Sequence, residues 1–389
     1  MNSIPYGRQD INQADINAVI DVLRSDFLTQ GPLVPMFESA VAKYCKAQHA
    51  VAVNSATSAL HIACLALGVG KGDVVWTTPI TFVASANCAL YCGATVDFVD
   101  IDPLTYNLSA ERLSEKLSLA EKMGKLPKVV IPVHLCGQPC DMASIYALSQ
   151  QYGFKIIEDA SHAIGGRYKD EPIGNGRYSD ITVFSFHPVK IITSGEGGMA
   201  VTNDAHLAKR MRLRRSHGIS STKEDMHPRP AQEIWNYQQI DLGFNYRMTD
   251  LQAALGLSQL KRIDAFVSQR HQIAKCYNKL LADLPLAIQW QHPNSYSAYH
   301  LYTIRLKLSK IKKTQRQVYE ELYSEKIGVN LHYIPVYRQP YYEQMGFKVG
   351  HCPEAEEYYQ EIVSIPMYSG LTQEQQDSVV QALFKTLIK

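Results

Sequence analysis

The sequence predicts an α/β fold in which a mostly parallel sheet precedes a smaller α+β unit. Over roughly the first 280 residues, short apolar runs alternate with amphipathic stretches, which is typical of strand–helix units. After Arg247 the pattern changes to one long periodic stretch. The chain has 389 residues, and at about 150 residues per domain this predicts one large and one smaller domain. We expect the large domain at residues 1–250, and a connecting helix with the small domain at 251–389.

The large domain is expected to contain these elements in order. Strands are predicted at residues 50–54, 73–78, 95–99, 128–133, 154–158, 181–184 and 199–202. Helices are predicted at residues 33–45, 57–67 and 81–91. A later basic run is interpreted as the solvated side of a helix; it consists of Lys209, Arg210, Arg212, Arg214 and Arg215.

The small domain is predicted from the second part of the chain. Residues 250–281 should form one or two helices, because Thr249 is a suitable cap and Leu251, Ala254 and Leu255 have the spacing of a buried face. A connector of this length commonly links a large α/β domain to a smaller one. Beyond residue 297, strands at 299–306 and 329–333 and a helix at 314–326 indicate an α+β domain.

Composition excludes several classes of protein. The 39 Lys and Arg residues nearly balance the 37 Asp and Glu residues, which gives a net charge of +2. Such a chain has no general attraction to nucleic acid or to anionic lipid. No window reaches the ~18 uninterrupted apolar residues of a membrane span, and the first residues lack the apolar core of a signal peptide. We therefore expect a cytoplasmic protein.

The eight cysteines are too sparse for a disulfide scaffold. Two pairs, Cys88/Cys92 and Cys136/Cys140, have three-residue gaps, but no second ligand pair with zinc-site spacing accompanies them. We predict buried free thiols and no metal site.

Three features stand where ligands bind in open α/β sheets, at the carboxyl ends of strands. The first is the segment Asn54-Ser-Ala-Thr-Ser-Ala-Leu, in which a strand runs directly into a helix. Backbone N–H groups and the helix dipole would face an anion there. Ser and Thr are also ordinary helix caps, so this feature alone is weak.

The second and third features carry charge. Glu158 and Asp159 end an apolar run, and His162 follows. A carboxylate at Asp159 could hold a positively charged ring nitrogen, bind a metal or cap the next turn. Lys190 lies in a loop rich in Gly, Ser and Thr; it could form a Schiff base if its pKa is depressed, or be surface charge.

Together the three features indicate pyridoxal phosphate. This cofactor needs a lysine for its covalent link, an acid on its pyridinium nitrogen and an anion cradle for its phosphate. A metal or a neutral ligand would explain one feature each, whereas pyridoxal phosphate explains all three.

Ordered motifs over almost the whole chain resemble the DegT/DnrJ/StrS family of sugar aminotransferases, which have the aspartate aminotransferase fold (fold type I). The resemblance implies that Lys190 binds the cofactor covalently and then moves the proton during transfer. It also implies that Asp159 pairs with the pyridinium nitrogen, that His162 lies against the phenolic oxygen and that Phe82 stacks on the ring. The motifs that carry it are Leu28-Thr-Gln-Gly-Pro, His49-Ala-Val-Ala-Val-Asn-Ser-Ala-Thr, Pro79-Ile-Thr-Phe-Val, Pro132-Val-His-Leu-Cys-Gly-Gln-Pro, Glu158-Asp-Ala-Ser-His-Ala-Ile-Gly, Ser185-Phe-His-Pro-Val-Lys, Gly195-Glu-Gly-Gly, Arg215-Ser-His-Gly and Gly243-Phe-Asn-Tyr-Arg-Met.

The same resemblance assigns the phosphate site and an assembly. Ala56, Thr57 and Ser185 would hold the phosphate, and Asn245 would reach it from the neighbouring subunit of a homodimer with shared active sites. Dehydratases of the family have histidine in place of the lysine. Lys190 therefore separates this chain from them, and Lys190 with Asp159 argues against a branch that acts in regulation without turnover.

Within the family, the segments Ile4-Pro-Tyr-Gly, Asp26-Phe-Leu-Thr-Gln-Gly and His332-Tyr-Ile-Pro resemble the branch of the pseudaminic acid pathway. This implies L-glutamate as donor and UDP-2-acetamido-2,6-dideoxy-β-L-arabino-hex-4-ulose as acceptor. The residues implied to contact the sugar nucleotide are Tyr6, Asp26, Phe27, Leu28, Thr29, Ala56, Asn245, His332, Tyr333, Ile334 and Pro335.

Other interpretations stay open. Residues 28–32 could be a turn before the helix at 33–45, and the segment at His332 could be a strand that ends at Pro335. Arg247 and Arg229 are candidate donors to a diphosphate, and the sequence does not choose between them. The acceptor could be another nucleotide 4-keto sugar, of a bacillosamine or legionaminic acid type of route. A catalytically silent protein that binds sugar nucleotide or a partner is the remaining alternative.

Overall fold

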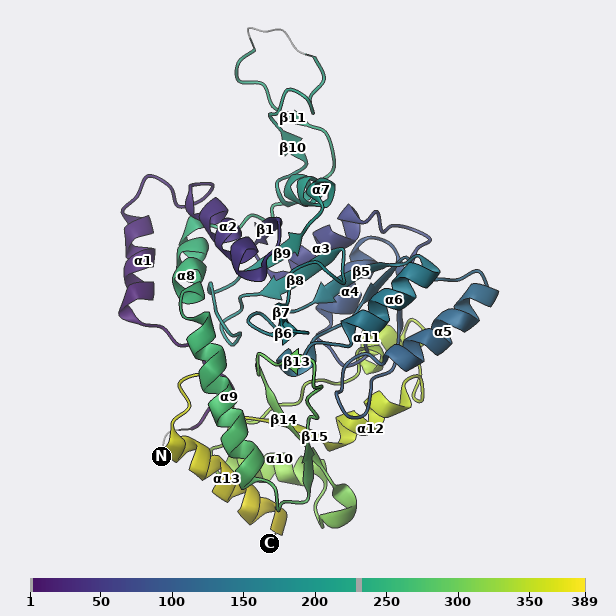
Figure 1. Cartoon of the computed structure of the whole chain (residues 1–389), viewed down its shortest axis with the longest axis vertical. Coiled ribbons are helices and arrows are strands. Elements are labelled where there is room, and N and C mark those ends of the chain that lie inside the picture. The colour runs from purple at the N-terminus through teal and green to yellow at the C-terminus, as the bar shows by residue number, and fades with distance from the viewer. Residues whose placement is uncertain (1–2, 229–232, 389) are drawn as a thin grey trace.

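The computed structural model describes residues 3–228 and 233–388. Its centre is a seven-stranded sheet in the order β1-β9-β8-β5-β4-β2-β3 (Figure 1). β9 is antiparallel to both β1 and β8, and the other neighbours are parallel. The mostly parallel sheet is therefore confirmed. Its strands are β1 (His49–Val53), β2 (Val74–Thr77), β3 (Thr95–Phe98), β4 (Val129–Ile131), β5 (Lys155–Asp159), β8 (Ile181–Ser185) and β9 (Gly198–Thr202).

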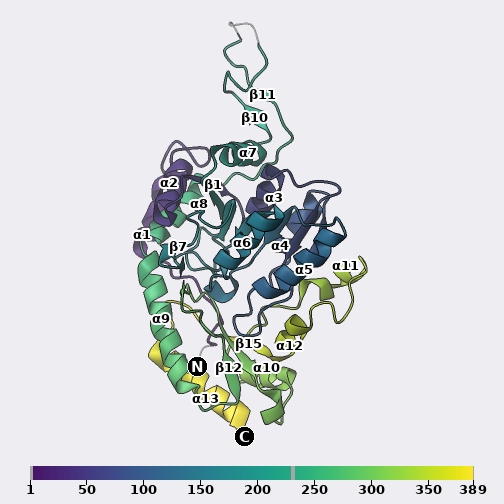
Figure 2. The same ribbon diagram turned by 45° about the vertical axis from the view of Figure 1, so that its right-hand side comes forward.

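Helices cover both faces of this sheet (Figure 2). Because side chains alternate along a strand, Ile157 of β5 packs in the core of one layer and Ile156 in the core of the other. The same alternation sends the next two residues, Glu158 and Asp159, to opposite faces. The first layer contains α3 (Ala56–Ala66), α4 (Ala84–Tyr91) and α7 (Ala205–Arg215); the second contains α2 (Leu33–Cys45), α5 (Ala110–Lys122), α6 (Met142–Tyr152) and the start of α9 (Ile263–Leu280).

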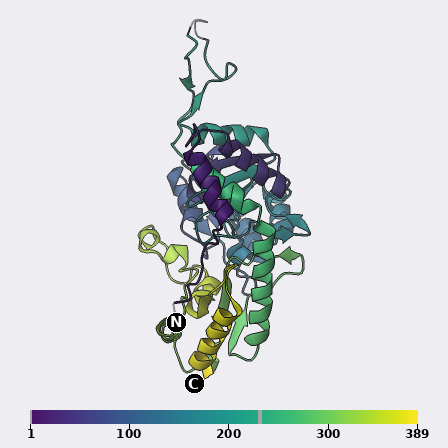
Figure 3. The same ribbon diagram turned by 90° about the vertical axis from the view of Figure 1, so that its left-hand side faces the viewer.

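Side-chain caps fix where these helices begin. The Ser55 hydroxyl accepts the Ser58 N–H at the start of α3, and Asp141 does the same for Ser144 of α6. Thr249 and Gln252 form a reciprocal capping box at the start of α8 (Asp250–Leu260). Residues 250–281, the long periodic stretch, thus form two helices, α8 and α9. Helix α9 extends from the large sheet to a second hydrophobic core in the C-terminal part of the chain (Figure 3).

The second core surrounds an antiparallel sheet in the order β12-β14-β15. Residues 329–333 were expected to form a strand, and that prediction is wrong: Asn330 forms only an isolated bridge with Ser364. The Asn330 side chain accepts the Leu331 N–H, which competes with a continuous ladder. The elements here are β12 (Leu286–Ile288), β14 (Tyr302–Leu306), β15 (Ile362–Ile365), α10 (Gln315–Ser324), α12 (Pro353–Glu361) and α13 (Gln373–Ile388).

Smaller elements complete the described chain. A two-stranded ribbon, β10 (Ile219–Ser220) and β11 (Gln238–Gln239), projects beyond α7 at the end of the molecule opposite the two termini (Figure 1). The others are α1 (Gln13–Leu23), β6 (Arg167–Tyr168), β7 (Glu171–Pro172), β13 (Ser295–Tyr296), α11 (Pro340–Glu343) and 3-10 turns at Leu135–Gly137, Leu308–Lys310 and Val336–Arg338. No helix in the described ranges is long and apolar enough to cross a membrane.

The basic run on α7 is not simply solvated, which corrects the expectation. Lys209 and Arg210 are exposed, but the other three side chains are half-buried and have protein partners. Arg212 donates to the Ala50 carbonyl, Arg214 pairs with Asp241 and Arg215 pairs with Glu38. These contacts tie α7 to the rest of the large unit.

All eight cysteines are free thiols. Cys88, Cys136 and Cys140 are buried, as predicted, whereas Cys92 is only half-buried.

Candidate active site

Asp159 is buried at the end of β5. Its Oδ2 accepts the Ser85 hydroxyl at 2.6 Å, and its Oδ1 accepts the Ser161 hydroxyl at 2.6 Å and the Ser161 N–H at 3.1 Å. The Ser85 hydroxyl in turn contacts that of Thr81 at 2.8 Å. These donors from α4 and from the following turn fix the carboxylate in one orientation.

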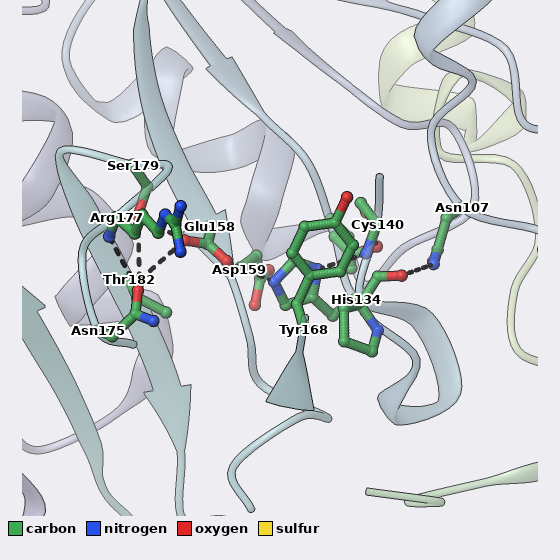
Figure 4. Close-up of polar contacts among 12 residues, drawn as sticks. Asn107, His134, Cys140, Glu158, Asp159, Tyr168, Asn175, Arg177, Ser179 and Thr182 are labelled. Atoms are coloured by element: carbon green, nitrogen blue, oxygen red, sulfur yellow. Dashed lines mark hydrogen bonds and ion pairs between the residues drawn. The ribbon is translucent and has the colours of Figure 1, made fainter. Parts of the chain in front are cut away.

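The neighbouring Glu158 lies on the opposite face of β5 and belongs to a separate polar cluster (Figure 4). Its carboxylate accepts hydrogen bonds from His134 at 2.7 Å, from Ser179 and from Thr182. Burial opposes ionisation, but the hydrogen bond from His134 and those from the two hydroxyls lower the pKa of Glu158. Glu158 is therefore saturated by protein partners.

Lys190 lies in the loop between β8 and β9, and burial lowers its pKa to about 8, although the charge of Asp159 opposes this shift. The loop is held at its base, where Phe186 N donates to the Gly197 carbonyl and Ser194 N donates to the Phe186 carbonyl. The Lys190 N–H donates to the His187 carbonyl at 2.9 Å. Near physiological pH a minor but appreciable fraction of an amine with this pKa is neutral, and a neutral amine is the nucleophilic form.

His162 is buried beside these residues, and its Nδ1 has no hydrogen-bond partner. Its Nε2 is 3.3 Å from the Tyr333 hydroxyl. Burial, with the charge of Lys190 and that of His332, holds the pKa of His162 well below its usual value. The imidazole is thus neutral, with one ring nitrogen free for a further partner.

Sequence reasoning missed a second buried histidine at this site. The His300 ring centroid is 4.4 Å from that of His162, and His300 Nδ1 also lacks a partner. Burial and the neighbouring charge of His162 hold the pKa of His300 well below its usual value. No motif marks it, because it precedes β14 in a stretch that reads only as a strand.

The start of α3 lies beside β8 and β9, and this junction, the cradle, is the candidate anion site. Ser185 pairs with Gly198 in the sheet register. A Cβ at Gly198 would lie 2.5 Å from Ala56 N, so only glycine allows this approach. The first N–H groups of a helix have no partner within it, and in α3 they belong to Ala56, which adjoins Gly198, and to Thr57.

A segment from the second core closes over the site. The Tyr6 and His332 ring centroids are 5.5 Å apart, and those of Phe82 and Tyr333 are 6.5 Å apart. His332 Nδ1 contacts the Ser364 hydroxyl at 2.8 Å, and burial lowers the pKa of His332 to about 3. The Val336 N–H after Pro335 donates to the Pro79 carbonyl at 2.9 Å.

The exposed fractions of Phe82, 60%, and Ile334, 39%, leave apolar surface beside the site. The structure thus brings Tyr6, Phe82 and residues 332–335 to the same region as Asp159, His162 and Lys190.

Two predicted segments are held by residues outside this cluster, although Tyr246, next to Asn245, accepts the Asn54 N–H where β1 leads into α3. Leu28 accepts the Asp250 N–H and Thr29 bridges Thr249, so residues 26–29 are tied to the start of α8, with Phe27 and Leu28 exposed. Asn245 is exposed and bridges Ser216. In the described chain, neither segment forms a hydrogen bond with Asp159, His162 or Lys190. Arg247 is half-buried near Asn245, and Arg229 lies outside the described residues.

These residues fit pyridoxal phosphate. Lys190 offers an amine whose lowered pKa leaves part of it neutral near physiological pH, Asp159 a fixed carboxylate, α3 free N–H groups at its start and Phe82 an exposed aromatic face. The unpartnered Nδ1 of His162 is a polar atom that the protein itself leaves unsatisfied, which buried groups rarely are.

Comparison with known proteins agrees with this geometry. The DegT/DnrJ/EryC1/StrS aminotransferase family model matches residues 9–384. The spore coat polysaccharide biosynthesis protein SpsC of Bacillus subtilis is 38% identical over 98% of this chain and 96% of its own. UDP-4-amino-4,6-dideoxy-N-acetyl-β-L-altrosamine transaminase of Campylobacter jejuni is 35% identical over 99% and 98%. PseC of Helicobacter pylori, an aminotransferase involved in pseudoaminic acid biosynthesis, superimposes with a TM-score of 0.90 at 30% identity over all of both chains.

A further solved sugar aminotransferase with this fold occurs in a pyridoxal phosphate form and in a pyridoxamine phosphate form, at 27% and 28% identity. The cofactor is therefore pyridoxal phosphate, and the fold is that of the fold type I enzymes. The chain belongs to the DegT/DnrJ/EryC1/StrS aminotransferase family.

Proposed function

We propose that this aminotransferase moves the amino group of L-glutamate to carbon 4 of UDP-2-acetamido-2,6-dideoxy-β-L-arabino-hex-4-ulose, a step of pseudaminic acid biosynthesis. The observation that carries the proposal is the group of Lys190, Asp159 and His162 in a chain that matches PseC along its full length. The Campylobacter relative, whose name states this type of sugar transaminase, supports the choice of acceptor.

Pyridoxal phosphate supplies an electron-withdrawing ring that accepts electron density from the bond cleaved in the amino donor. Lys190 would hold the cofactor, and its Nζ would then take up and return a proton, since its pKa lies near the working pH. The Asp159 carboxylate would hold positive charge at the ring nitrogen. His162 Nδ1 would meet the phenolic oxygen, and Phe82 would exclude water from one ring face.

The cradle would hold the phosphate. Ala56 and Thr57 at the start of α3 present N–H groups with the positive end of the helix dipole, and Ser185 contributes a hydroxyl. The sugar nucleotide would contact Tyr6 and residues 332–335 from the same chain.

The remaining predicted contacts would come from a second subunit. Asn245 is exposed, and the adjoining segment carries Trp235 at 74% and Leu242 at 67% exposure. Exposed apolar side chains of this size support burial against a partner. We therefore infer a homodimer in which Asn245 reaches the partner's phosphate, and residues 26–29 belong to the sugar nucleotide site.

The acceptor is tested by mass spectrometry of products with glutamate present. The β-L-arabino 4-keto sugar and its α-D-xylo isomer, both as UDP conjugates, are run in parallel. Amination of the first alone is the expected result. Amination of the second alone would contradict the proposed acceptor and place the enzyme in a bacillosamine or legionaminic acid type of route. A protein whose cofactor keeps its yellow colour with glutamate would be a silent binder.

The shared site is tested by mixing inactive variants. Asn245→Ala and Lys190→Ala homodimers should both be inactive, whereas mixed dimers should regain activity, because one of their two sites keeps both native residues. A matched control mixes Asp159→Ala with Lys190→Ala, which lie in the same chain's site and should give no such recovery. A fully active monomer would contradict the role of Asn245.

A further inference from the structure

Tyr333 contacts His162 through its hydroxyl group, at the ring nitrogen opposite the one assigned to the cofactor. The hydroxyl oxygen is 3.3 Å from His162 Nε2, and the two rings are stacked at an interplanar angle of 23°, with centroids 6.3 Å apart. The other ring nitrogen, Nδ1, is buried and has no partner. The imidazole therefore has one nitrogen held by the protein and one left for a ligand.

The surroundings of the Tyr333 hydroxyl give this hydrogen bond a direction. Within the described residues, His162 Nε2 is the acceptor in its reach, and desolvation raises the pKa of the hydroxyl, which therefore keeps its proton. A neutral imidazole has one N–H group and one acceptor nitrogen. Since the buried His162 is neutral, a donating Tyr333 makes Nε2 the acceptor and leaves the ring proton on Nδ1.

A second contact limits the rotation of the His162 ring. The His300 ring packs beside it, with centroids 4.4 Å apart and an interplanar angle of 50°. A Cβ at Gly137 would lie 2.9 Å from the His162 carbonyl oxygen and 3.1 Å from the His300 backbone nitrogen, so a glycine is needed where these backbones approach. The buried Arg270 donates to the His300 carbonyl at 3.1 Å. His162 thus has a fixed neighbour beside its ring as well as the hydroxyl at Nε2.

The segment that carries Tyr333 is anchored to the elements of the second sheet. The Tyr358 hydroxyl of α12 donates to the His332 carbonyl at 2.8 Å, and His332 Nδ1 is 2.8 Å from the hydroxyl of Ser364 in β15. Both Tyr358 and Ser364 are buried. Tyr333 is therefore held at His162 by parts of the chain that are remote in sequence from the cofactor residues.

We propose that Tyr333 is a positioning residue for the transfer reaction, because its hydroxyl fixes the His162 tautomer in which Nδ1 carries the proton and donates to the cofactor's phenolic oxygen. This role depends on the proposed function, in which His162 lies beside that oxygen. A hydrogen bond to a charged group favours its charged form, so the donation lowers the pH at which the bound cofactor loses its proton. Without the Tyr333 hydroxyl, the ring proton can move to Nε2, and Nδ1 then stops donating.

A pH titration of the cofactor-loaded protein tests this role, because the colour of the bound cofactor follows its protonation. Tyr333→Phe removes only the hydroxyl, and the pH midpoint of the absorbance change should rise by about 1 unit, which corresponds to one hydrogen bond to a charged group. Tyr358→Phe is the matched control: it removes a hydroxyl from the same segment but none from His162, so the midpoint should stay. Both variants keep the other charged or titratable groups around His162 and Tyr333, which are Asp159, Lys190, His300 and His332.

The variant His162→Leu separates this role from the proposed function. It should raise the midpoint at least as much as Tyr333→Phe, and Tyr333→Phe should add nothing in the His162→Leu protein. An unchanged midpoint in His162→Leu would contradict the place of His162 beside the phenolic oxygen, and the role of Tyr333 with it. A shift in His162→Leu but none in Tyr333→Phe would overturn the role of Tyr333 alone, even if Tyr333→Phe raised the KM for the sugar nucleotide. The titration contains no sugar, so its outcome does not depend on the acceptor.

Nitrogen-15 NMR of the wild-type apoprotein, labelled at histidine, decides the matter if a variant folds poorly. The His162 signals are identified by their loss in His162→Asn. The expected spectrum has the ring proton of His162 on Nδ1 and an unprotonated Nε2. A ring proton on Nε2 would overturn the role of Tyr333.

Discussion

The two faces of β5 carry buried polar groups that differ in how completely the protein satisfies them. On one face, Glu158 accepts hydrogen bonds from His134, Ser179 and Thr182, and His134 Nδ1 accepts the Cys140 N–H. On the other face, the nitrogens Nδ1 of His162 and of His300 have no partner.

Burial and charge therefore do not by themselves mark a functional residue. Glu158 and Asp159 are consecutive, both acidic and both 4% exposed. What separates them is their surroundings, because a histidine nitrogen without a partner and a lysine with a depressed pKa lie beside Asp159, whereas hydrogen-bonded groups surround Glu158. We interpret the Glu158 face as structural and the Asp159 face as the cofactor site.

The largest expected effect is that of Lys190→Ala. Turnover should fall by at least about 10⁴-fold, since both the covalent link and the proton transfer are lost. In the apoprotein the melting temperature should not fall, because the substitution removes a buried amine that is costly to desolvate. Steady-state amination and thermal unfolding measure the two effects, and normal turnover in this variant would contradict the mechanism.

Asp159→Asn should follow in size. The amide keeps the shape, its oxygen can still accept from Ser161 and its NH2 can donate to the Ser85 hydroxyl oxygen, but it cannot hold positive charge on the ring. We expect turnover to fall about 10²–10³-fold, comparable to the loss of one strong electrostatic contact in an active site, with little change in stability. If the Asp159→Asn enzyme were as active as the wild type, the ring nitrogen of the cofactor would not pair with Asp159.

Glu158→Ala should give the opposite pattern. His134, Ser179 and Thr182 would lose their shared acceptor, and each unsatisfied buried group costs about 1–3 kcal/mol. We expect the free energy of unfolding to fall by about 2–4 kcal/mol, with the turnover of the remaining folded enzyme changed little. Denaturant unfolding and turnover per folded molecule check this. If Glu158→Ala abolished turnover without loss of stability, the contrast between the two faces would be wrong.

The pH dependence of cofactor binding tests whether the pKa of Lys190, on the Asp159 face, is depressed. Under the proposed mechanism only neutral Lys190 attacks the cofactor aldehyde, and its pKa is about 8. The rate of cofactor uptake by the apoprotein should therefore rise about 20-fold between pH 6.5 and 8.5 and level off above pH 9. Absorbance of the bound cofactor gives the rate. A lysine with an ordinary pKa would show a rate that keeps rising beyond pH 9, about sevenfold between pH 9 and pH 10, and that levels off only above about pH 11.

The sequence predicted the main sheet and the order of its elements because apolar runs and helix caps are local signals. Asp159 and Lys190 were predicted to carry the chemistry because each follows a strand, and the parallel sheet brings the ends of β5 and β8 together.

Other parts of the site depend on contacts between residues that are far apart in the sequence. The Ser85 hydroxyl on Asp159 joins residues 74 positions apart, and the Tyr333 hydroxyl on His162 joins residues 171 apart. The segment 329–333 was mistaken for a strand because its alternating apolar residues pack into the hydrophobic cores, whereas its backbone pairing is a single bridge. His300 was missed because a lone histidine before a strand carries no local pattern.

The most direct test of the central claim is to reduce the cofactor-loaded protein with borohydride and map its peptides by mass spectrometry. Reduction makes the link between lysine and cofactor permanent, so the cofactor's mass stays on the residue that holds it. We expect the cofactor's mass on Lys190 alone. Its appearance on another lysine, or on none, would contradict the assignment of the Asp159 face as the active site.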